Sequence, residues 1–145
     1  MLTRLFVSHS WDYDYVLQDM EALLNGRGYF PIELTQEEKL LPINSNLAWA
    51  IQADIIKKME KADAVLVISS VFDTHSEWML WEIGKAKELG LTVIGVVPKG
   101  QKRVSQDVGK RTDMIVPWNA DSIIGAIHKY SKKTNSSNHY AHTEP

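Results

Sequence analysis

Side chains that could perform chemistry gather in three places along this chain. The first group directly follows a short apolar run and contains Ser8, His9, Ser10, Trp11 and Asp12. The second group follows the most apolar run of the chain and contains Ser69, Phe72 and His75. The third is Glu82, which has Trp78 one helical turn before it. Hydroxyl, imidazole, carboxyl and aromatic groups together can bind a polar ligand that carries rings.

Glu82 breaks the pattern of the helix that the sequence predicts over residues 76–89. At 100° per residue from Trp78, Glu82 falls near 40°, within the apolar arc that also contains Met79, Ile83, Ala86 and Leu89. One explanation is that Glu82 turns to the edge of the arc and pairs with Lys85. The other is that Glu82 and Trp78 face a ligand crevice, where a carboxylate beside an aromatic ring suits a ligand that develops positive charge.

The sequence lacks the residues that several other classes of enzyme or signalling domain require. Ser8, His9 and Asp12 do not form a hydrolytic triad, because no Gly-x-Ser-x-Gly turn occurs and residues so close in sequence rarely converge correctly. A phospho-receiver domain requires an aspartate where Ser69 stands. There is no cysteine, phosphate-binding glycine loop or spaced metal-ligand cluster. We therefore expect no metal site and no cofactor.

Apolar strand-like runs alternate with amphipathic helical segments from residue 3 to residue 130. The runs at 63–70 and 91–97 are continuously apolar, as expected of strands covered on both faces by helices. Pro31, inside the expected strand at 29–34, places that strand at a sheet edge. The pattern predicts a flavodoxin-like, doubly wound five-stranded parallel sheet of order 2-1-3-4-5. The ligand crevice of such a sheet lies at the carboxyl ends of strands one and three, where the first two polar groups stand.

Two connecting regions carry further expectations. A helix is predicted to begin near Asn44 or Ser45, with Leu47 and three later apolar residues on its buried side. Residues 99–111 are predicted to form a polar loop, in which five basic residues and one acidic residue give a net charge of +4. Such a run is usually solvated surface, and the alternative is a role in holding phosphates.

Composition indicates one soluble globular domain. The 145 residues are 44% apolar and 23% charged, with a formal charge of −2. We expect a domain over residues 1–131 and a flexible polar tail over residues 132–145. The near-neutral charge argues against nucleic acid as the partner, and no segment reads as a signal peptide or membrane span, so a cytoplasmic protein without membrane attachment is expected.

Three motifs in a fixed order resemble a TIR (Toll/interleukin-1 receptor) domain. They are Leu-Phe-Val-Ser-His-Ser at residues 5–10, Lys-Ala-Asp-Ala-Val-Leu-Val-Ile-Ser-Ser at 61–70 and Ser-Glu-Trp-Met-Leu-Trp-Glu-Ile at 76–83. The likeness is strongest to the bacterial TIR-like proteins of Thoeris-type antiphage systems. The arginine-containing signature that many TIR domains carry in their second loop is missing from residues 35–45.

The resemblance implies an enzyme that cleaves NAD+ at the nicotinamide ribosyl bond. It places the catalytic glutamate at Glu82 and the tryptophan of its helix at Trp78. The substrate-binding residues that we expect are Ser8, His9, Ser10, Trp11, Asp12, Ser69, Phe72 and Trp78. The resemblance also implies self-association, with residues 35–45 as the contact, and an effector that responds to a cyclic ADP-ribose-type product. Two alternatives remain open at this stage: a non-catalytic TIR adaptor, and an enzyme similar to nucleoside deoxyribosyltransferases.

Overall fold

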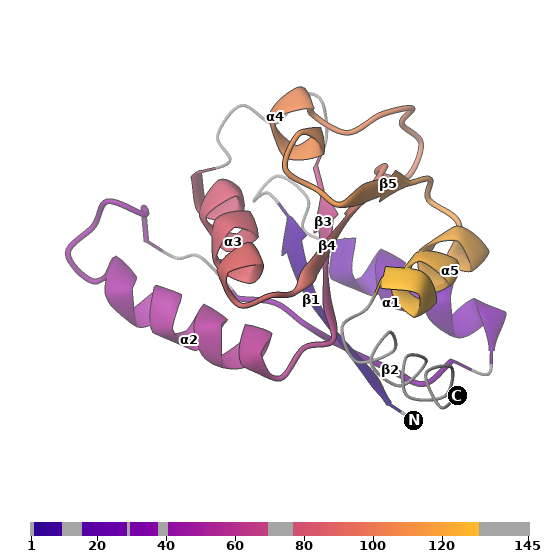
Figure 1. Ribbon diagram of the computed structural model, residues 1–145, viewed down its shortest axis with the longest axis horizontal. Coiled ribbons are helices and arrows are strands. Elements are labelled where there is room, and N and C mark those ends of the chain that lie inside the picture. The colour runs from indigo at the N-terminus through magenta and orange to yellow at the C-terminus, as the bar shows by residue number, and fades with distance from the viewer. Residues whose placement is uncertain (1, 10–15, 29, 38–40, 70–76, 131–145) are drawn as a thin grey trace, which may run out of the picture.

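The computed structural model describes residues 2–9, 16–28, 30–37, 41–69 and 77–130. Within these ranges strands and helices alternate strictly (Figure 1). The strands are β1 (Thr3–His9), β2 (Ile32–Thr35), β3 (Ala64–Ile68), β4 (Thr92–Val96) and β5 (Met114–Val116). The helices are α1 (Val16–Arg27), α2 (Ala48–Glu60), α3 (Glu77–Glu88), α4 (Gln106–Gly109) and α5 (Ala120–Tyr130).

The strands form one parallel sheet in the order β2-β1-β3-β4-β5, which confirms the predicted topology. Strand β2 lies at an edge as Pro31 predicts, and the carbonyl of Pro31 accepts a hydrogen bond from the amide of Thr3 at 3.0 Å. In the register of β1 and β3, Ser8 stands opposite Val67. This register brings the carboxyl ends of β1 and β3 together at one rim of the sheet, which we call the carboxyl rim.

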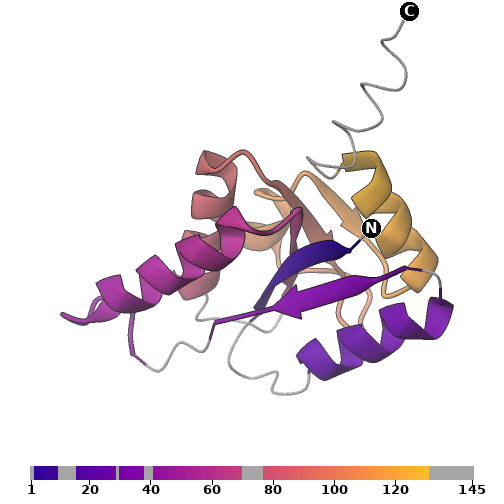
Figure 2. The same ribbon diagram turned by 90° about the horizontal axis from the view of Figure 1, so that it is seen from below.

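Helices cover both faces of the sheet (Figures 1 and 2). One apolar cluster packs α1 and α5 against Leu5 and Val7 of β1, and the other packs α2 and α3 against Phe6. Because side chains of a strand alternate between faces, Ser8 lies on the face of Phe6, under α2 and α3. This alternation determines which helix Ser8 can reach.

Two aspartates that precede strands fix the pairing of their neighbours. The carboxylate of Asp63 accepts a hydrogen bond from the Arg4 amide at 2.8 Å, while the Asp63 amide donates to the Arg4 carbonyl at 2.7 Å. Asp113 holds Val93 in the same way, at 2.7 and 2.8 Å. Each aspartate thereby extends a parallel ladder by one residue at the amino end of a strand and sets its register.

The predicted start of the second helix is wrong. Helix α2 begins at Ala48. Backbone turns precede it, in which the amide of Ser45 donates to the carbonyl of Pro42 and the amide of Ala48 donates to the carbonyl of Ser45. No side chain caps the helix. Leu47, expected on the buried side, lies before the helix and is 58% exposed, and Ala48 takes the buried position instead.

The predicted loop at residues 99–111 contains the short helix α4. Ser105 caps it by accepting a hydrogen bond from the Val108 amide, and Val104 and Val108 are buried. A single helical turn carries too few residues for a periodic signal, which explains why the sequence pattern missed it.

The predicted tail at residues 132–145 lies outside the described residues, and its role stays a prediction. None of the described helices has the length and apolar character that crossing a membrane requires.

We predict that Asp63→Ala lowers the free energy of unfolding by about 1–3 kcal/mol, because the Arg4 amide loses a charged acceptor. Asp113→Ala should cost less, because Asp113 is exposed whereas Asp63 is only 4% exposed. Urea unfolding of both variants measures the difference. Equal losses would show that burial does not set the strength of this contact.

Candidate functional site

A fully buried hydrogen bond joins β1 to α3. The hydroxyl of Ser8 donates to Oε1 of Glu82 at 2.5 Å, and both residues are 0% exposed. The two residues are 74 positions apart in sequence, and this contact across the sheet face links the first strand to the middle of the helix that follows β3. A buried carboxyl group requires polar partners, and Ser8 supplies one.

Helix α3 positions Glu82 by the same periodicity that singled it out in the sequence. Trp78, Met79, Ile83 and Ala86 are buried along with it. The surface alternative is contradicted, because Lys85 forms its ion pair with Glu88 at 3.2 Å and lies 5.7 Å from the centre of the Trp81 ring. Glu82 therefore stays inside the apolar arc, where a carboxyl group contributes less to packing than an apolar side chain would.

Trp78 lies one turn before Glu82 and is 7% exposed. Its indole Nε1 donates to the carbonyl of Leu41 at 2.8 Å, and its ring meets Trp81 edge-on with centroids 6.0 Å apart. Trp78 thus connects α3 to the chain that precedes α2. Sequence reasoning found Trp78 but not its partner, since a backbone carbonyl leaves no mark in the sequence.

His9 ends β1 on the opposite face from Ser8, because it pairs with Ile68 in the cluster under α1 and α5. Its Nε2 forms a hydrogen bond with Oε1 of Gln36, just beyond β2. Lys58 of α2 fixes this part of the chain through the Gln36 carbonyl at 2.7 Å and the Glu37 carboxylate at 2.8 Å. His9 therefore stands at the rim but across the sheet plane from Glu82.

Ser69 follows β3 and is fully buried. Its hydroxyl donates to Oγ of Ser105 at 3.2 Å, so the cap of α4 is fixed to the carboxyl end of β3. Nothing in the sequence pattern indicated Ser105 or Gln36, because each forms a single side-chain contact and belongs to no repeating pattern of residues. Ser8, Ser69 and His9 thus gather at the carboxyl rim, as the topology predicts.

Several residues predicted to bind substrate lie outside the described part of the chain, namely Ser10, Trp11, Asp12 and Phe72. Their roles stay predictions. Among the described residues, no group of three or more histidines and carboxylates is arranged to hold a metal ion.

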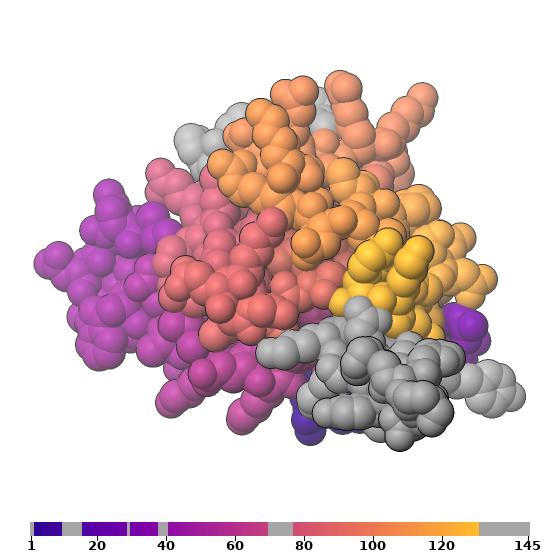
Figure 3. Space-filling view, viewed as in Figure 1, coloured from indigo at the N-terminus to yellow at the C-terminus, as the bar shows by residue number. Residues whose placement is uncertain are grey.

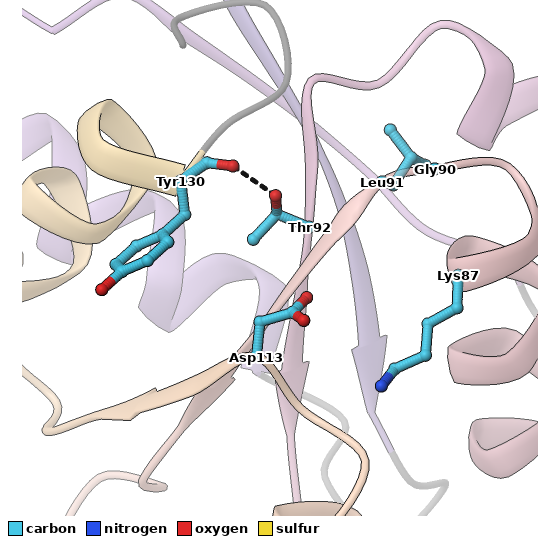
Figure 4. Close-up of a pocket in the computed structure, with 6 residues that line it drawn as sticks. All are labelled: Lys87, Gly90, Leu91, Thr92, Asp113 and Tyr130. Atoms are coloured by element: carbon cyan, nitrogen blue, oxygen red, sulfur yellow. Dashed lines mark hydrogen bonds between the residues drawn. The ribbon is translucent and has the colours of Figure 1, made fainter.

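An open cavity of about 530 Å³ lies at the other end of the sheet (Figure 4). Thr92 and Asp113 line it at the amino ends of β4 and β5, and Lys87 and Tyr130 border it from the ends of α3 and α5. Two of its polar groups already serve the fold, since Thr92 Oγ1 donates to the Tyr130 carbonyl and Asp113 accepts from Val93. The length of the strands separates this cavity, at their amino ends, from the carboxyl rim.

Comparison with solved structures shows the same fold in two other proteins. A 2-deoxyribosyltransferase from Bacillus psychrosaccharolyticus matches with a TM-score of 0.59 and 13% identity, over 91% of this chain and 95% of that one. A CMP N-glycosidase, BcmB, from Clostridium botulinum matches with a TM-score of 0.50 and 12% identity, over 86% and 98%. No curated protein sequence matches the chain.

The family comparison is more specific than the fold. The model for Thoeris protein ThsB, TIR-like domain, matches residues 6–103, which begin in β1 and end just before α4. The matched range contains Ser8, Ser69, Trp78 and Glu82. It covers more than half of the chain and confirms the resemblance drawn from the three motifs. The chain belongs to the family of ThsB TIR-like domains of Thoeris systems.

Proposed function

We propose that this protein cleaves NAD+ at the bond between nicotinamide and ribose, with Glu82 as the catalytic carboxylate. The observation that carries the proposal is the Ser8–Glu82 hydrogen bond, because it fixes a carboxyl group inside an otherwise apolar helix face. The family match supports it. The two proteins of similar fold are named as a deoxyribosyltransferase and an N-glycosidase, which agrees with chemistry at a glycosidic carbon.

The chemistry requires little more than a fixed negative group. Nicotinamide leaves NAD+ as a neutral base, so no acid has to protonate it, and positive charge develops on the ribosyl carbon as the bond breaks. A carboxylate held in place beside that carbon lowers the barrier without having to reorganise. Water or a nucleophile within the ADP-ribose then completes the reaction, giving a linear or a cyclic product.

Glu82 is completely covered in this structure, so the substrate must gain access to it. We propose that association of subunits opens and completes the site, with residues 35–45 as the contact. The product then acts on an effector in bacterial antiphage defence. The exposed side chains of Leu47 and Trp49, at 58% and 65%, lie close to this segment and provide apolar surface for such a contact.

Chromatography after incubation with NAD+, and separately with deoxynucleosides, tests the proposed reaction. Nicotinamide release from NAD+ supports it, and base exchange on deoxynucleosides assigns the protein to the deoxyribosyltransferase class instead. Turnover of neither, with the protein assembled, indicates an adaptor.

We expect Glu82→Gln to slow nicotinamide release by about a hundred- to a thousandfold, to a residual rate that can still be measured, while the free energy of unfolding changes by less than about 1 kcal/mol. The amide oxygen still accepts the hydrogen bond from Ser8, and the substitution removes a charge that is costly to bury. Glu88→Gln on the same helix is the matched control, because Glu88 is exposed and should leave both quantities unchanged. Retained turnover together with a large loss of stability would make Glu82 a structural residue.

Specific activity should rise with protein concentration, because a shared site exists only in the assembled form. Activity measured over a wide concentration range, with light scattering on the same samples, checks this expectation. Constant specific activity from a species that stays monomeric would rule out a shared site.

A further inference from the structure

The segment at residues 98–103 concentrates positive charge at the carboxyl rim. It contains Lys99, Lys102 and Arg103 and no acidic residue, in a chain whose formal charge is −2. All three side chains are exposed. The ion pairs among the described residues use other cations, so no described carboxylate neutralises these three. We call Lys99, Lys102 and Arg103 the basic rim.

The fold fixes this segment at the rim rather than leaving it as a free loop. On one side it follows β4 directly, where Val97 donates to the Val116 carbonyl at 2.9 Å. A turn from Pro98 to Gln101 follows, and Gly100 has a φ of 79°, which favours glycine. On the other side Ser105 is held by Ser69 at the end of β3. Figure 1 shows this connection between β4 and α4 at the top of the view.

The anchored end of this segment lies near the Ser8–Glu82 pair along the sheet, because Ser105 is bonded to Ser69 at the end of β3. Ser69 lies two residues beyond Val67, which stands opposite Ser8. Standard strand spacing and rise then put the Cα atoms of Ser8 and Ser69 roughly 8 Å apart. In Figure 3 the side chains of the salmon-to-orange segment that includes residues 98–103 form the upper boundary of the molecule.

We propose that the basic rim binds the diphosphate of the substrate. This inference rests on the proposed function, because it assigns the anionic part of the same dinucleotide. In NAD+ the anomeric carbon that loses nicotinamide is separated from the nearest phosphate by the ribose ring and one methylene group. A carboxyl group at Glu82 and a cationic segment that follows β4, two strands along the sheet from Ser8, therefore match the cationic and anionic parts of one ligand. Lysine and arginine are the side chains that hold phosphate oxygens most strongly.

Neutralising the basic rim tests the assignment. The triple variant Lys99→Gln/Lys102→Gln/Arg103→Gln should raise KM for NAD+ about tenfold or more and leave kcat within about twofold, because uniform binding energy is lost. Its kcat/KM for nicotinamide riboside, which has no phosphate, should stay unchanged. The control triple Lys57→Gln/Lys61→Gln/Lys129→Gln removes the same charge from exposed positions away from the rim and should leave KM unchanged. An unchanged KM for NAD+ in the rim variant, with wild-type turnover intact, overturns this proposal and leaves the proposed function standing.

Titration with inorganic pyrophosphate, followed by calorimetry, separates the two proposals. The wild-type protein should bind it, the rim variant should lose at least about tenfold in affinity, and the control triple should match the wild type. If NAD+ is not cleaved but this pattern holds, the basic rim stands and the proposed function fails. If the wild type does not bind pyrophosphate, or all three proteins bind it equally, the basic rim is not an anion site.

Discussion

One buried hydrogen bond, from Ser8 to Glu82, connects the first strand to the helix on which the proposed chemistry depends. A carboxyl group with no exposure is costly to place inside a protein, and an apolar residue at position 82 would pack against the same neighbours without that cost. The family match and the proposed reaction supply a reason to keep it. A carboxylate that is held by a neighbouring hydroxyl and shielded from water interacts more strongly with a developing cation than an exposed one does.

The strand pairing of the sheet makes this hydrogen bond possible. Parallel pairing of β1 with β3 puts the carboxyl ends of both strands at one rim, and the crossover through α3 returns over the face to which Ser8 points. Asp63 sets the β1–β3 register from the amino end by bonding Arg4. A shift of one residue in that pairing would change which β3 residue stands opposite Ser8, and Ser69 would move relative to it. The contact between Asp63 and Arg4 at the amino ends of β1 and β3 therefore determines which residues stand opposite each other at the carboxyl ends of these strands.

The sequence predicted the order of the strands from continuous apolar runs and the edge position of β2 from a proline that lacks a donor. The period of 3.6 residues placed Glu82 within the apolar arc of its helix but left open whether it is buried or pairs with Lys85 at the edge of the arc. Sequence reasoning failed where a single contact replaces a pattern. Backbone turns determine where α2 begins, and Leu47 is exposed although its spacing placed it on the buried side. The partners of the site are of the same kind. Gln36 forms a hydrogen bond with His9, and Ser105 forms one with Ser69. The carbonyl of Leu41 accepts one from Trp78. The spacing of residues in the sequence predicts none of these three contacts.

A double-mutant cycle on Ser8 and Glu82, read in the rate of nicotinamide release, tests the central claim most directly. If Ser8 acts by positioning Glu82, Ser8→Ala should slow release in the wild-type background and have no further effect in Glu82→Gln. Ser8→Thr, which keeps the hydroxyl, should retain most of the activity. Equal effects of Ser8→Ala in both backgrounds would show that the two residues act independently. The buried hydrogen bond would then not be the basis of the site.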